Sequence, residues 1–470
     1  MKTNIFKGFL FLALLAVMQS CFSAKEYQRP ELKTENLYRT SVLETDTVSL
    51  ADVSWDKIFT DPQLQNHIKN GLQNNLDIQI AMQNIAASQA SLRQAKAAYL
   101  PTFSVGADWT HQEISKNTQI GRLVAGSGGP TNVDQYQLTG NLGWEADIWG
   151  KIRSGKRAAN ANFMQTVAAQ QAVKTQLIAN IAATYYQMLS VDAQIKIAES
   201  TLQNRNESVE TIFALKDAGN VTEVAVKQTE AQKFATEIII ADLKNSLIVL
   251  ENSFNILLGE NPKPVERSTF ETQNLQPKIT LGVPATLLRN RPDVVAAEYN
   301  LIALFEQTNV ARSNFYPTFR ITATGGFQSI DLKDWFSTNS LFANIVTGLT
   351  QPIFNQRRIK SQYEIAQANQ QAAYLQFEQS LLNAGNEVSN ALANYENETY
   401  KITVREKQVD ALKKAADYSD ELLTYGLANY LEVLTAKDNA LNAELSLIDN
   451  KYQQYNAIIQ LYRALGGGWQ

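Results

Sequence analysis

Two long segments of the chain combine a seven-residue hydrophobic spacing with an absence of helix breakers. No proline lies between Pro130 and Pro262, and none follows Pro352. Glycine is almost as sparse in both segments. A chain that avoids both residues over such lengths is predicted to be helical. A continuous helix over 156–218 would be roughly 95 Å long at 1.5 Å per residue, which far exceeds the usual globular helix.

The hydrophobic spacing defines one seam in each of these segments. The first seam comprises Ile181, Met188, Ile195, Leu202 and Val209, and the second comprises Leu381, Val388, Tyr395, Ile402, Val409, Ala416 and Leu423. Spacing of this kind predicts helices that supercoil around partners. Each long helix should end at a glycine-containing turn, 218–220 or 425–427, and return as a shorter antiparallel helix over about 222–258 or 430–465. We therefore expect two long helical hairpins.

Four shorter segments alternate hydrophobic with polar residues and predict β-strands. They cover about 102–110, 135–145, 318–328 and 343–351. Each has about the 9–11 residues of a tilted membrane strand. Aromatic residues gather near the strand ends, as they do at membrane interfaces: Phe103, Trp109, Tyr136, Trp144, Trp149, Phe319 and Phe327. Four strands cannot enclose a pore, and eight would leave room only for side chains, so a lumen requires a barrel of twelve strands shared by three chains. The hairpin loops, 111–134 and 329–341, should lie outside the cell.

The whole arrangement occurs twice, with a period of about 210 residues. Tyr-Leu-Pro-Thr-Phe at 99–103 returns as Phe-Tyr-Pro-Thr-Phe at 315–319. Gly-Asn-Val-Thr-Glu-Val at 219–224 matches Ala-Asn-Tyr-Leu-Glu-Val at 428–433, and Leu-Leu-Gly at 257–259 matches Ala-Leu-Gly at 464–466. Such a period is too long for a solenoid unit and indicates one structural half built twice.

These landmarks divide the chain into five parts. We expect a signal peptide (1–20), a lipid anchor with an N-terminal segment and first helix (21–98), a first repeat (99–261), an equatorial linker (262–286) and a second repeat (287–470). The hairpins should cover about 152–258 and 356–465, and a helix should precede the third strand at 292–314.

The N-terminus has the features of an export signal. Lys2 and Lys7 precede an apolar run, 9–17, that is too short to span a bilayer. Cys21 is the only cysteine and follows Ser20, as in a lipobox, so we expect lipidation of Cys21. Acyl chains on this residue would anchor the protein stably. The alternative is a soluble signal peptide with an incidental cysteine.

Composition excludes several classes of function. The chain carries 42 basic and 46 acidic residues, for a net charge of −4, and has no basic stripe for nucleic acid. His67 and His111 are the only histidines, so one chain cannot build a His/Cys metal cluster. No catalytic triad or phosphate loop is present. We expect a protein that is not an enzyme, with no metal site and no cofactor other than the covalent lipid.

Several motifs in fixed order resemble one family across nearly the whole mature chain. They are Tyr-Gln-Arg-Pro at 27–30, Trp55 with Phe-Thr-Asp-Pro at 59–62, Asn-Leu-Asp at 75–77, Trp-Glu-Ala-Asp-Ile-Trp-Gly-Lys-Ile-Arg at 144–153, Leu-Arg-Asn-Arg-Pro-Asp-Val at 288–294, Gln-Pro-Ile-Phe at 351–354 and Tyr-Leu-Glu-Val-Leu at 430–434. Together they are similar to the TolC-like outer membrane factor family, in the lipoprotein (OprM/NodT-like) branch that serves tripartite RND efflux systems.

The resemblance implies an α+β membrane protein that works as a homotrimer. Its 12-stranded β-barrel would cross the outer membrane of a double-membraned bacterium, and a coiled-coil-like α-helical tunnel would continue it into the periplasm, with a small mixed equatorial region. The implied partners are a periplasmic adaptor protein, an inner-membrane RND pump and outer-membrane lipids. The implied function is a passive exit duct for small toxic compounds. Two alternatives stay open, a channel for type I protein secretion and a structural or adhesive trimeric lipoprotein. The substrate, drug or metal, also stays open.

The resemblance further implies roles for residues at the hairpin turns. Acidic residues after the second turn line the narrowest aperture in the family, and Glu432 matches the first of them. The second falls on Thr435, a departure from the family pattern that leaves open whether the closed aperture has one polar ring or two. An arginine that some members place nearby falls on Ala428. The turns themselves, Gly219-Asn220 and Gly426-Leu427, would contact the adaptor.

Overall fold

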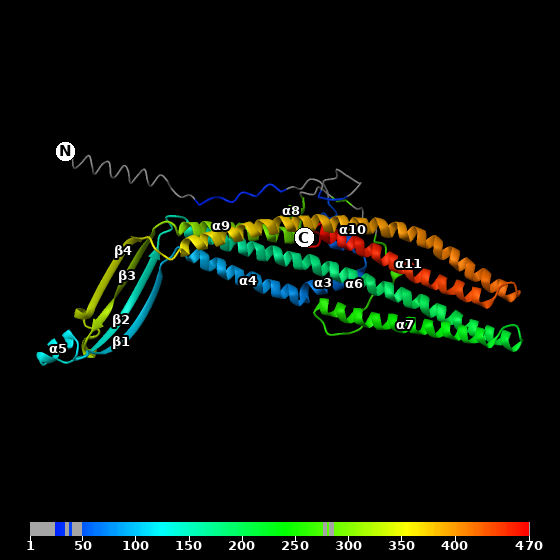
Figure 1. Ribbon diagram of the computed structural model, residues 1–470, viewed down its shortest axis with the longest axis horizontal. Coiled ribbons are helices and arrows are strands. Elements are labelled where there is room, and N and C mark those ends of the chain that lie inside the picture. Colours follow the sequence, from blue (N-terminus) through cyan, green and yellow to red (C-terminus); the bar gives the residue numbers. More distant parts are fainter. Residues whose placement is uncertain (1–23, 33–36, 40–48, 276–279, 282–285, 470) are drawn as a thin grey trace. The chain divides into compact units, whose positions relative to one another are not determined.

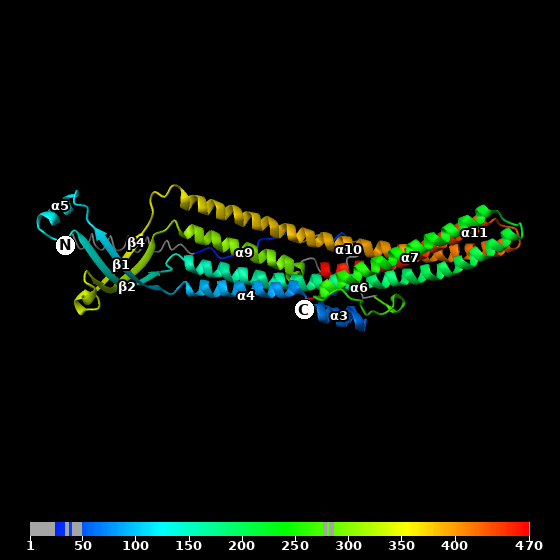
Figure 2. The ribbon, with the colours of Figure 1, turned by 90° about the horizontal axis from the view of Figure 1, so that it is seen from below.

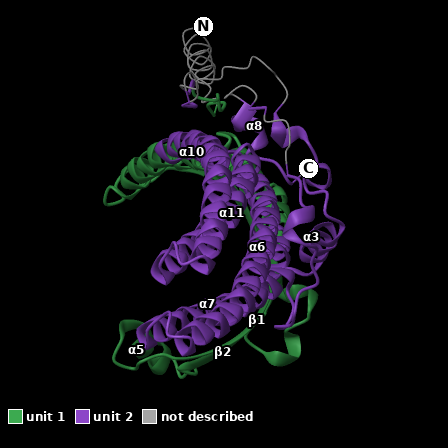
Figure 3. Cartoon of the chain, turned by 90° about the vertical axis from the view of Figure 1, so that its right-hand side faces the viewer, with its two compact units in different colours: residues 1–30, 87–163, 299–374 green, residues 31–86, 164–298, 375–470 purple. Residues whose placement is uncertain are grey.

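The computed structural model describes residues 24–32, 37–39, 49–275, 280–281 and 286–469. The predicted signal peptide and Cys21 lie outside these residues. Contacts divide the chain into two units (Figure 3), and each unit contains parts of both sequence repeats. Unit 1 holds residues 1–30, 87–163 and 299–374, and unit 2 holds residues 31–86, 164–298 and 375–470.

Unit 1 contains a four-stranded antiparallel sheet (Figure 1). The strands are β1 (Thr102–Glu113), β2 (Asn132–Glu145), β3 (Thr318–Ser329) and β4 (Leu341–Thr350), in the order β1-β2-β3-β4. Each repeat contributes one hairpin, and β2 pairs with β3 to join the repeats, with Leu138 opposite Phe327. β1 and β4 are the two edges of the sheet and each pairs with only one neighbour.

The strands start and end close to the positions that alternation predicts, but the first connecting loop contains a helix. α5 (Gln119–Gly126) lies between β1 and β2. The Thr118 hydroxyl caps this helix by accepting a hydrogen bond from the Gly121 amide at 3.1 Å. The second loop contains two short 3₁₀ turns, η4 (Leu332–Asp334) and η5 (Thr338–Ser340). Apolar side chains on alternate positions of β1 are exposed in the single chain: Phe103, Val105 and Trp109.

Two helical hairpins follow the strands, one in each repeat (Figure 2). α6 (Lys151–Asp217) and α10 (Arg358–Thr424) are each 67 residues long, which corresponds to about 100 Å. α7 (Glu223–Leu258) and α11 (Tyr430–Ala464) return antiparallel to them. The equal lengths of α6 and α10 are the structural counterpart of the sequence repeat. Among the described residues, none of the helices combines the length and hydropathy that a bilayer crossing requires.

The two predicted seams differ in how deeply their side chains are buried. In the second seam Leu381, Val388, Val409 and Ala416 are all buried. In the first seam Ile181 and Met188 are buried, whereas the later members are only half-buried. Beyond Met188 the buried row of α6 lies three residues along, at Val191, Ala198, Arg205 and Ile212. A seven-residue repeat has two core positions, and the second of them faces the interior in this part of α6.

The return helix of each hairpin ends against the start of a shorter helix. α7 ends at Gly259, where a Cβ atom would lie 2.5 Å from the Asn74 carbonyl oxygen, just before α4 (Leu76–Ala97). α11 is followed by Gly466, where a Cβ atom would lie 2.4 Å from the Asn290 carbonyl oxygen, just before α9 (Pro292–Ser313). The two glycines therefore make the same close approach in the two repeats, and both have positive φ.

This close approach predicts a difference between two glycine substitutions. Gly426→Ala keeps a positive φ of 71° with no atom within 4 Å of the new Cβ, so it should cost about 1–2 kcal/mol. Gly466→Ala meets the same backbone penalty and also collides with the Asn290 carbonyl, which should add about 1–3 kcal/mol. Thermal melting of the purified full-length variants measures both, and equal melting temperatures would contradict the close approach.

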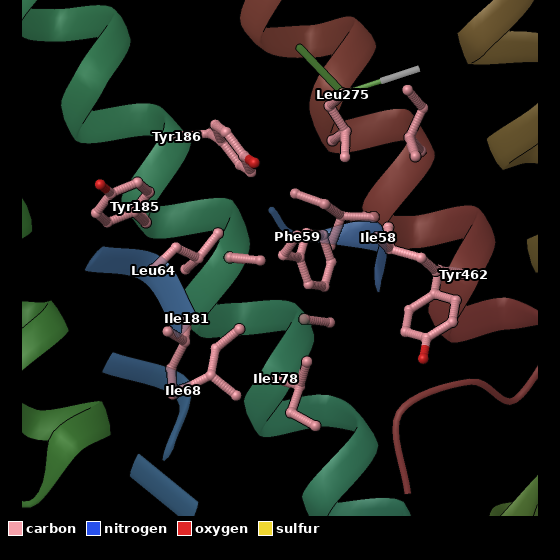
Figure 4. Close-up of a cluster of buried hydrophobic side chains, with 14 of the residues drawn as sticks. Ile58, Phe59, Leu64, Ile68, Ile178, Ile181, Tyr185, Tyr186, Leu275 and Tyr462 are labelled. Carbon is pink, nitrogen blue, oxygen red and sulfur yellow. The ribbon is translucent and has the colours of Figure 1, made fainter. Parts of the chain in front are cut away.

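The hydrophobic core of unit 2 lies where the middle of α6 meets the helices of the N-terminal segment (Figure 4). α2 (Trp55–Ile58) leads to Phe59, and α3 (Pro62–Asn74) supplies Leu64 and Ile68. The Phe59 ring packs edge-on against Tyr462 of α11 at 6.1 Å between centroids. α3 comes close to α6 because Gly71 has no side chain, since a Cβ atom there would lie 2.5 Å from Ile181 Cδ1.

A buried carboxylate, Asp61, ties the linker to this core. Asp61 caps α3 by accepting a hydrogen bond from the Gln63 amide at 2.8 Å. It also accepts hydrogen bonds from Tyr185 Oη at 2.9 Å, Ser268 Oγ at 3.1 Å and Gln273 Nε2 at 2.9 Å. Burial raises the pKa of Tyr185 to about 12, so its hydroxyl stays protonated and can donate. The chain around Ser268 and Gln273, part of the predicted linker, is therefore fixed to both α3 and α6.

A buried arginine joins the start of α9 to α10 and α11. Arg291 is 4% exposed and pairs with Asp293 through Nε at 2.9 Å and with Glu387 through Nη1 at 2.7 Å. Its Nη1 also donates to the Ala464 carbonyl oxygen at 3.1 Å. Burial opposes ionisation of Asp293, but the hydrogen bonds and charge of Arg291 outweigh it and lower the pKa of Asp293 below its ordinary value.

Candidate functional site at the helical tips

The turn of each hairpin is a glycine-containing helix end of one type. The Gly219 amide donates to the Lys216 carbonyl at 2.9 Å and the Asn220 amide to the Leu215 carbonyl at 2.8 Å. The Gly426 and Leu427 amides make the matching bonds to the Leu423 and Leu422 carbonyls, at 3.0 and 2.9 Å. This pair of backbone hydrogen bonds is the Schellman motif, which needs positive φ at the glycine. All four of the predicted turn residues are exposed at the two tips.

Glu432 lies in the first turn of α11 and belongs to its N-terminal cap. The Asn429 side-chain oxygen accepts a hydrogen bond from the Glu432 amide at 3.0 Å, and the Asn429 amide group donates to the Glu432 carboxylate at 3.2 Å. An acidic residue here is also favoured by the positive end of the helix dipole. Glu432 is exposed, so its carboxylate stays accessible at the tip although it takes part in the cap.

Thr435 follows Glu432 by three residues and therefore lies on the same face of α11. Its hydroxyl donates to the Leu431 carbonyl at 2.8 Å, within its own helix, and the side chain is exposed. The structure thus brings Glu432 and Thr435 together on one face next to the second turn. The first turn, Gly219-Asn220, belongs to the other hairpin.

A small apolar cluster holds the two tips against each other. Ile212, Ala225 and Val226 of the first hairpin are buried, and Leu423 and Tyr430 of the second hairpin pack against them. The Tyr430 hydroxyl also makes a hydrogen bond with the Gln228 side chain of α7. The tips of one chain are therefore in direct contact, through a surface much smaller than the core in Figure 4.

Charged residues add contacts between the hairpins one to two helical turns farther from the tips. Arg205 of α6 is 4% exposed and forms an ion pair with Asp438 of α11. Arg205 Nη1 also donates to the Gln232 side chain of α7 at 3.3 Å. Lys437 of α11 donates to Ser208 of α6 at 3.2 Å. We call Arg205, Asp438, Tyr430 and Gln228 the latch, because these residues connect the second hairpin to both helices of the first.

The latch is not among the site residues that the sequence predicts, although one signal was present. Arg205 occupies the second core position of the seven-residue repeat in α6, between Ala198 and Ile212. A charged residue in an apolar seam must be paired or it would be unstable. The partner could not be found in the same way, because Asp438 lies 233 residues away and nothing in its local pattern marks it.

The two histidines belong to different units, His67 to unit 2 and His111 to unit 1. His67 Nε2 is 2.8 Å from the Glu266 carbonyl oxygen, and its ring packs edge-on against Phe254. His111 Nδ1 is 2.9 Å from Asp134 across the β1–β2 hairpin. In the part of the chain that the structure describes, no group of three His, Cys, Asp or Glu side chains is arranged to hold a metal ion.

Comparison with known proteins gives a consistent picture. The family model described as outer membrane efflux protein matches residues 67–260 and 283–467, which correspond to the two repeats. The chain is 28% identical to the cation efflux system protein CusC of Escherichia coli (strain K12), over 96% of this chain and 97% of that protein. It is 27% identical to the solvent efflux pump outer membrane protein SrpC of Pseudomonas putida, over 99% and 98%. It is 26% identical to the probable outer membrane lipoprotein SilC of Salmonella typhimurium, over 98% of each.

The fold is similar to that of a solved member of this group. A crystal structure of CusC superimposes with a TM-score of 0.83 at 26% identity, and covers 95% of this chain and all of that chain. The similarity therefore includes the sheet, both hairpins and the segments that join them.

Proposed function

Since this chain belongs to the outer membrane efflux protein family, we propose that it works as a homotrimer whose three sheets close into one 12-stranded barrel. The chain is an outer-membrane efflux channel, as its relatives are. The trimer and the barrel are supported by the two unpaired edges of the sheet, β1 and β4. A sheet edge presents free backbone hydrogen-bonding groups, and these cannot stay unpaired in a bilayer.

The helical hairpins would form the periplasmic tunnel of this channel. The observation that carries the proposal is the direct continuation of each membrane hairpin into a helix of 67 residues, in both repeats. Six such helices in a trimer would extend the barrel by up to about 100 Å. The tips would then meet a periplasmic adaptor protein, through Gly219-Asn220 and Gly426-Leu427, and behind it an inner-membrane RND pump. We propose that the chain conducts passively and carries out no chemistry.

The second hairpin would be the moving part of a gate at the tips. Glu432 and Thr435 from three chains would line the aperture, one ring acidic and the other a hydroxyl ring. The latch would keep the second hairpin against the first and so keep the aperture closed. Packed helices move by small sliding and rotation. Docking of the adaptor at the tips would open the aperture by breaking the latch.

Lipidation of Cys21 would anchor the channel to the same membrane as the barrel. The protein is located in the outer membrane, as its relatives are. The names of the relatives differ in cargo, since CusC is named for cations and SrpC for solvents. We therefore propose small toxic compounds as the cargo, with the choice among them made by the pump.

Deletion of the gene in its native host tests the efflux role. Cells without the protein should accumulate severalfold more of a fluorescent efflux dye such as ethidium, because the pump loses its exit. The wild-type gene on a plasmid should restore low accumulation. A matched plasmid that encodes Gly466→Ala should restore it poorly, because that variant is destabilised. Unchanged accumulation of dyes, solvents and metal ions, together with loss of a secreted protein, would favour type I secretion instead.

A further inference from the structure

Each membrane hairpin is followed by apolar side chains that the described chain leaves exposed. After β2, Ile148 is 49% exposed, and after β4, Ile353 and Phe354 are 78% and 97% exposed. Single exposed apolar residues are common on soluble surfaces. Here they occur at the same place in both repeats, and both places lie in unit 1. The repetition indicates a surface with a shared task.

The backbone after Phe354 is held in an unfavourable conformation. Gln356 and Arg357 have φ values of 55° and 64°, so two consecutive residues with side chains occupy the left-handed region. Residues other than glycine adopt this region at a cost, and such strain persists only where surrounding structure maintains it. The segment that carries Ile353 and Phe354 is therefore a defined turn into α10.

Basic residues follow the exposed apolar residues in both repeats. Lys151, Arg153, Lys156 and Arg157 begin α6, and Arg357, Arg358 and Lys360 begin α10. Neither helix has an acidic residue in its first turn. Cations at a helix N-terminus oppose the helix dipole, so helix stability does not account for them.

Three of these seven cations have carboxylate partners among the described residues. Lys151 pairs with Glu145 at 2.9 Å, Arg157 with Glu306 at 3.5 Å and Arg357 with Glu364 at 3.2 Å. Asp147 also precedes α6, and its carboxylate accepts hydrogen bonds from the backbone amides of Ile152 and Arg153 and so caps the helix. The exposed side chains without an ion pair to any described residue are Arg153, Lys156, Arg358 and Lys360.

The N-terminal segment lies against the same unit. Lys25 accepts a hydrogen bond through its carbonyl from Asn309 Nδ2 at 3.0 Å, and the Tyr27 ring packs edge-on against Phe305 at 5.7 Å. Both partners lie in α9, whose last residue precedes β3 by only a few positions. Ala24, buried here, follows the predicted lipid-bearing Cys21 by three positions. The chain at Ala24–Tyr27 therefore lies against α9 of unit 1.

We propose that these residues form a binding surface for anionic phospholipids of the periplasmic leaflet. The surface, which we call the junction surface, consists of Ile148, Ile353 and Phe354 with Arg153, Lys156, Arg358 and Lys360. The proposal rests on the proposed function, in that the sheet spans the outer membrane and its helix-proximal ends face the periplasm. An anionic phospholipid matches both halves of the surface, because its phosphate neutralises cations and its acyl chains receive apolar side chains. A second copy of this chain fits the surface less well, because it would place the same cations against these ones.

Lipid titration of the purified full-length protein tests this proposal. The measurement is native mass spectrometry in detergent, with phosphatidylglycerol as the probe and phosphatidylcholine as the uncharged-headgroup reference. The wild type should reach half-occupancy at a concentration of phosphatidylglycerol at least tenfold below that of phosphatidylcholine. Each cation near an anionic surface contributes about fivefold. The variant Arg153→Gln/Lys156→Gln/Arg358→Gln/Lys360→Gln should therefore lose at least tenfold in affinity for phosphatidylglycerol and little for phosphatidylcholine.

Two control variants separate a lipid site from a general charge effect. Lys69→Gln/Lys407→Gln removes exposed cations of unit 2 that also lack an ion pair among the described residues, and it should leave the affinity within about twofold of the wild type. Arg358→Lys/Lys360→Arg keeps the charges and should keep the affinity. Circular dichroism and the melting temperature establish that each variant is folded.

Three outcomes would overturn the proposal. The first is equal affinity of the wild type for the two lipids. The second is unchanged phosphatidylglycerol affinity in the folded four-residue variant. The third is dissociation of the trimer in that variant with unchanged lipid selectivity, which would assign the junction surface to another copy of the chain. Channel conductance measured on the same samples tests the proposed function separately, since a non-conducting protein that still selects phosphatidylglycerol would contradict only the channel.

Discussion

Arg291→Met should lower the free energy of unfolding by about 3–5 kcal/mol, the largest loss that we expect from a single substitution outside the tips. The substitution removes the buried cation from the Asp293 carboxylate and the donor to the Ala464 carbonyl, and it leaves Glu387 with only its ion pair to Arg463 at 3.3 Å. Methionine fills a similar volume, so the loss reports charge and hydrogen bonding more than packing. Thermal melting and the yield of folded protein measure the effect.

Two further variants make this prediction specific. Lys244→Met removes an exposed cation that pairs with Glu199 at 2.7 Å, and it should cost less than about 1 kcal/mol. In the double variant Arg291→Met/Asp293→Asn the carboxylate that has lost its buried cation is gone, while Glu387 keeps its ion pair with Arg463, so part of the stability should return. Equal melting temperatures for Arg291→Met and Lys244→Met would show that Arg291 does not connect α9, α10 and α11 as described.

Arg205→Ala should open the channel. The substitution removes the ion pair with Asp438, which links the two hairpins, and also the hydrogen bond to Gln232 within the first hairpin. A hydrogen bond that involves a charged group stabilises by about 1.5–3 kcal/mol, so its loss should raise the ratio of open to closed channels about 10- to 100-fold. Cells that express the variant should become sensitive to vancomycin, an antibiotic that an intact outer membrane excludes.

The control for Arg205→Ala is an ion pair within one hairpin. Lys413 of α10 pairs with Glu444 of α11 at 2.9 Å, and both residues belong to the second hairpin. Lys413→Ala should therefore leave vancomycin sensitivity unchanged, because it does not connect the hairpins. Arg205→Lys, which keeps the charge without the branched donor group, should give intermediate sensitivity. If Arg205→Ala and Lys413→Ala behave alike, the latch does not hold the gate.

The hairpins and strands could be predicted because local patterns determine them. The absence of proline predicted α6 and α10, and the helix ends follow from Gly219 and Gly426, which satisfy the last carbonyls of each helix. The alternation of polar and apolar residues predicted the four strands, and the repeat predicted that β1-β2 and β3-β4 are equivalent. These features depend on residues close together in the sequence.

Contacts between distant residues could not be predicted in this way. Asp61 reaches Tyr185 and Ser268, and Arg205 reaches Asp438, only after the helices have taken a particular register against each other. A seven-residue repeat leaves two core positions open, which is why the first predicted seam misses the buried row at Arg205. The roles of Glu432 and Thr435 stay predictions, because an aperture requires three chains.

Single-channel recording tests the central claim, that this chain is a gated channel, most directly. Purified full-length protein is inserted into planar lipid bilayers, with the wild type and Arg205→Ala recorded side by side. Our account predicts brief, small conductance steps for the wild type and long-lived, larger steps for the variant. Absence of any conductance from both proteins, with folded trimer inserted in the bilayer, would contradict it.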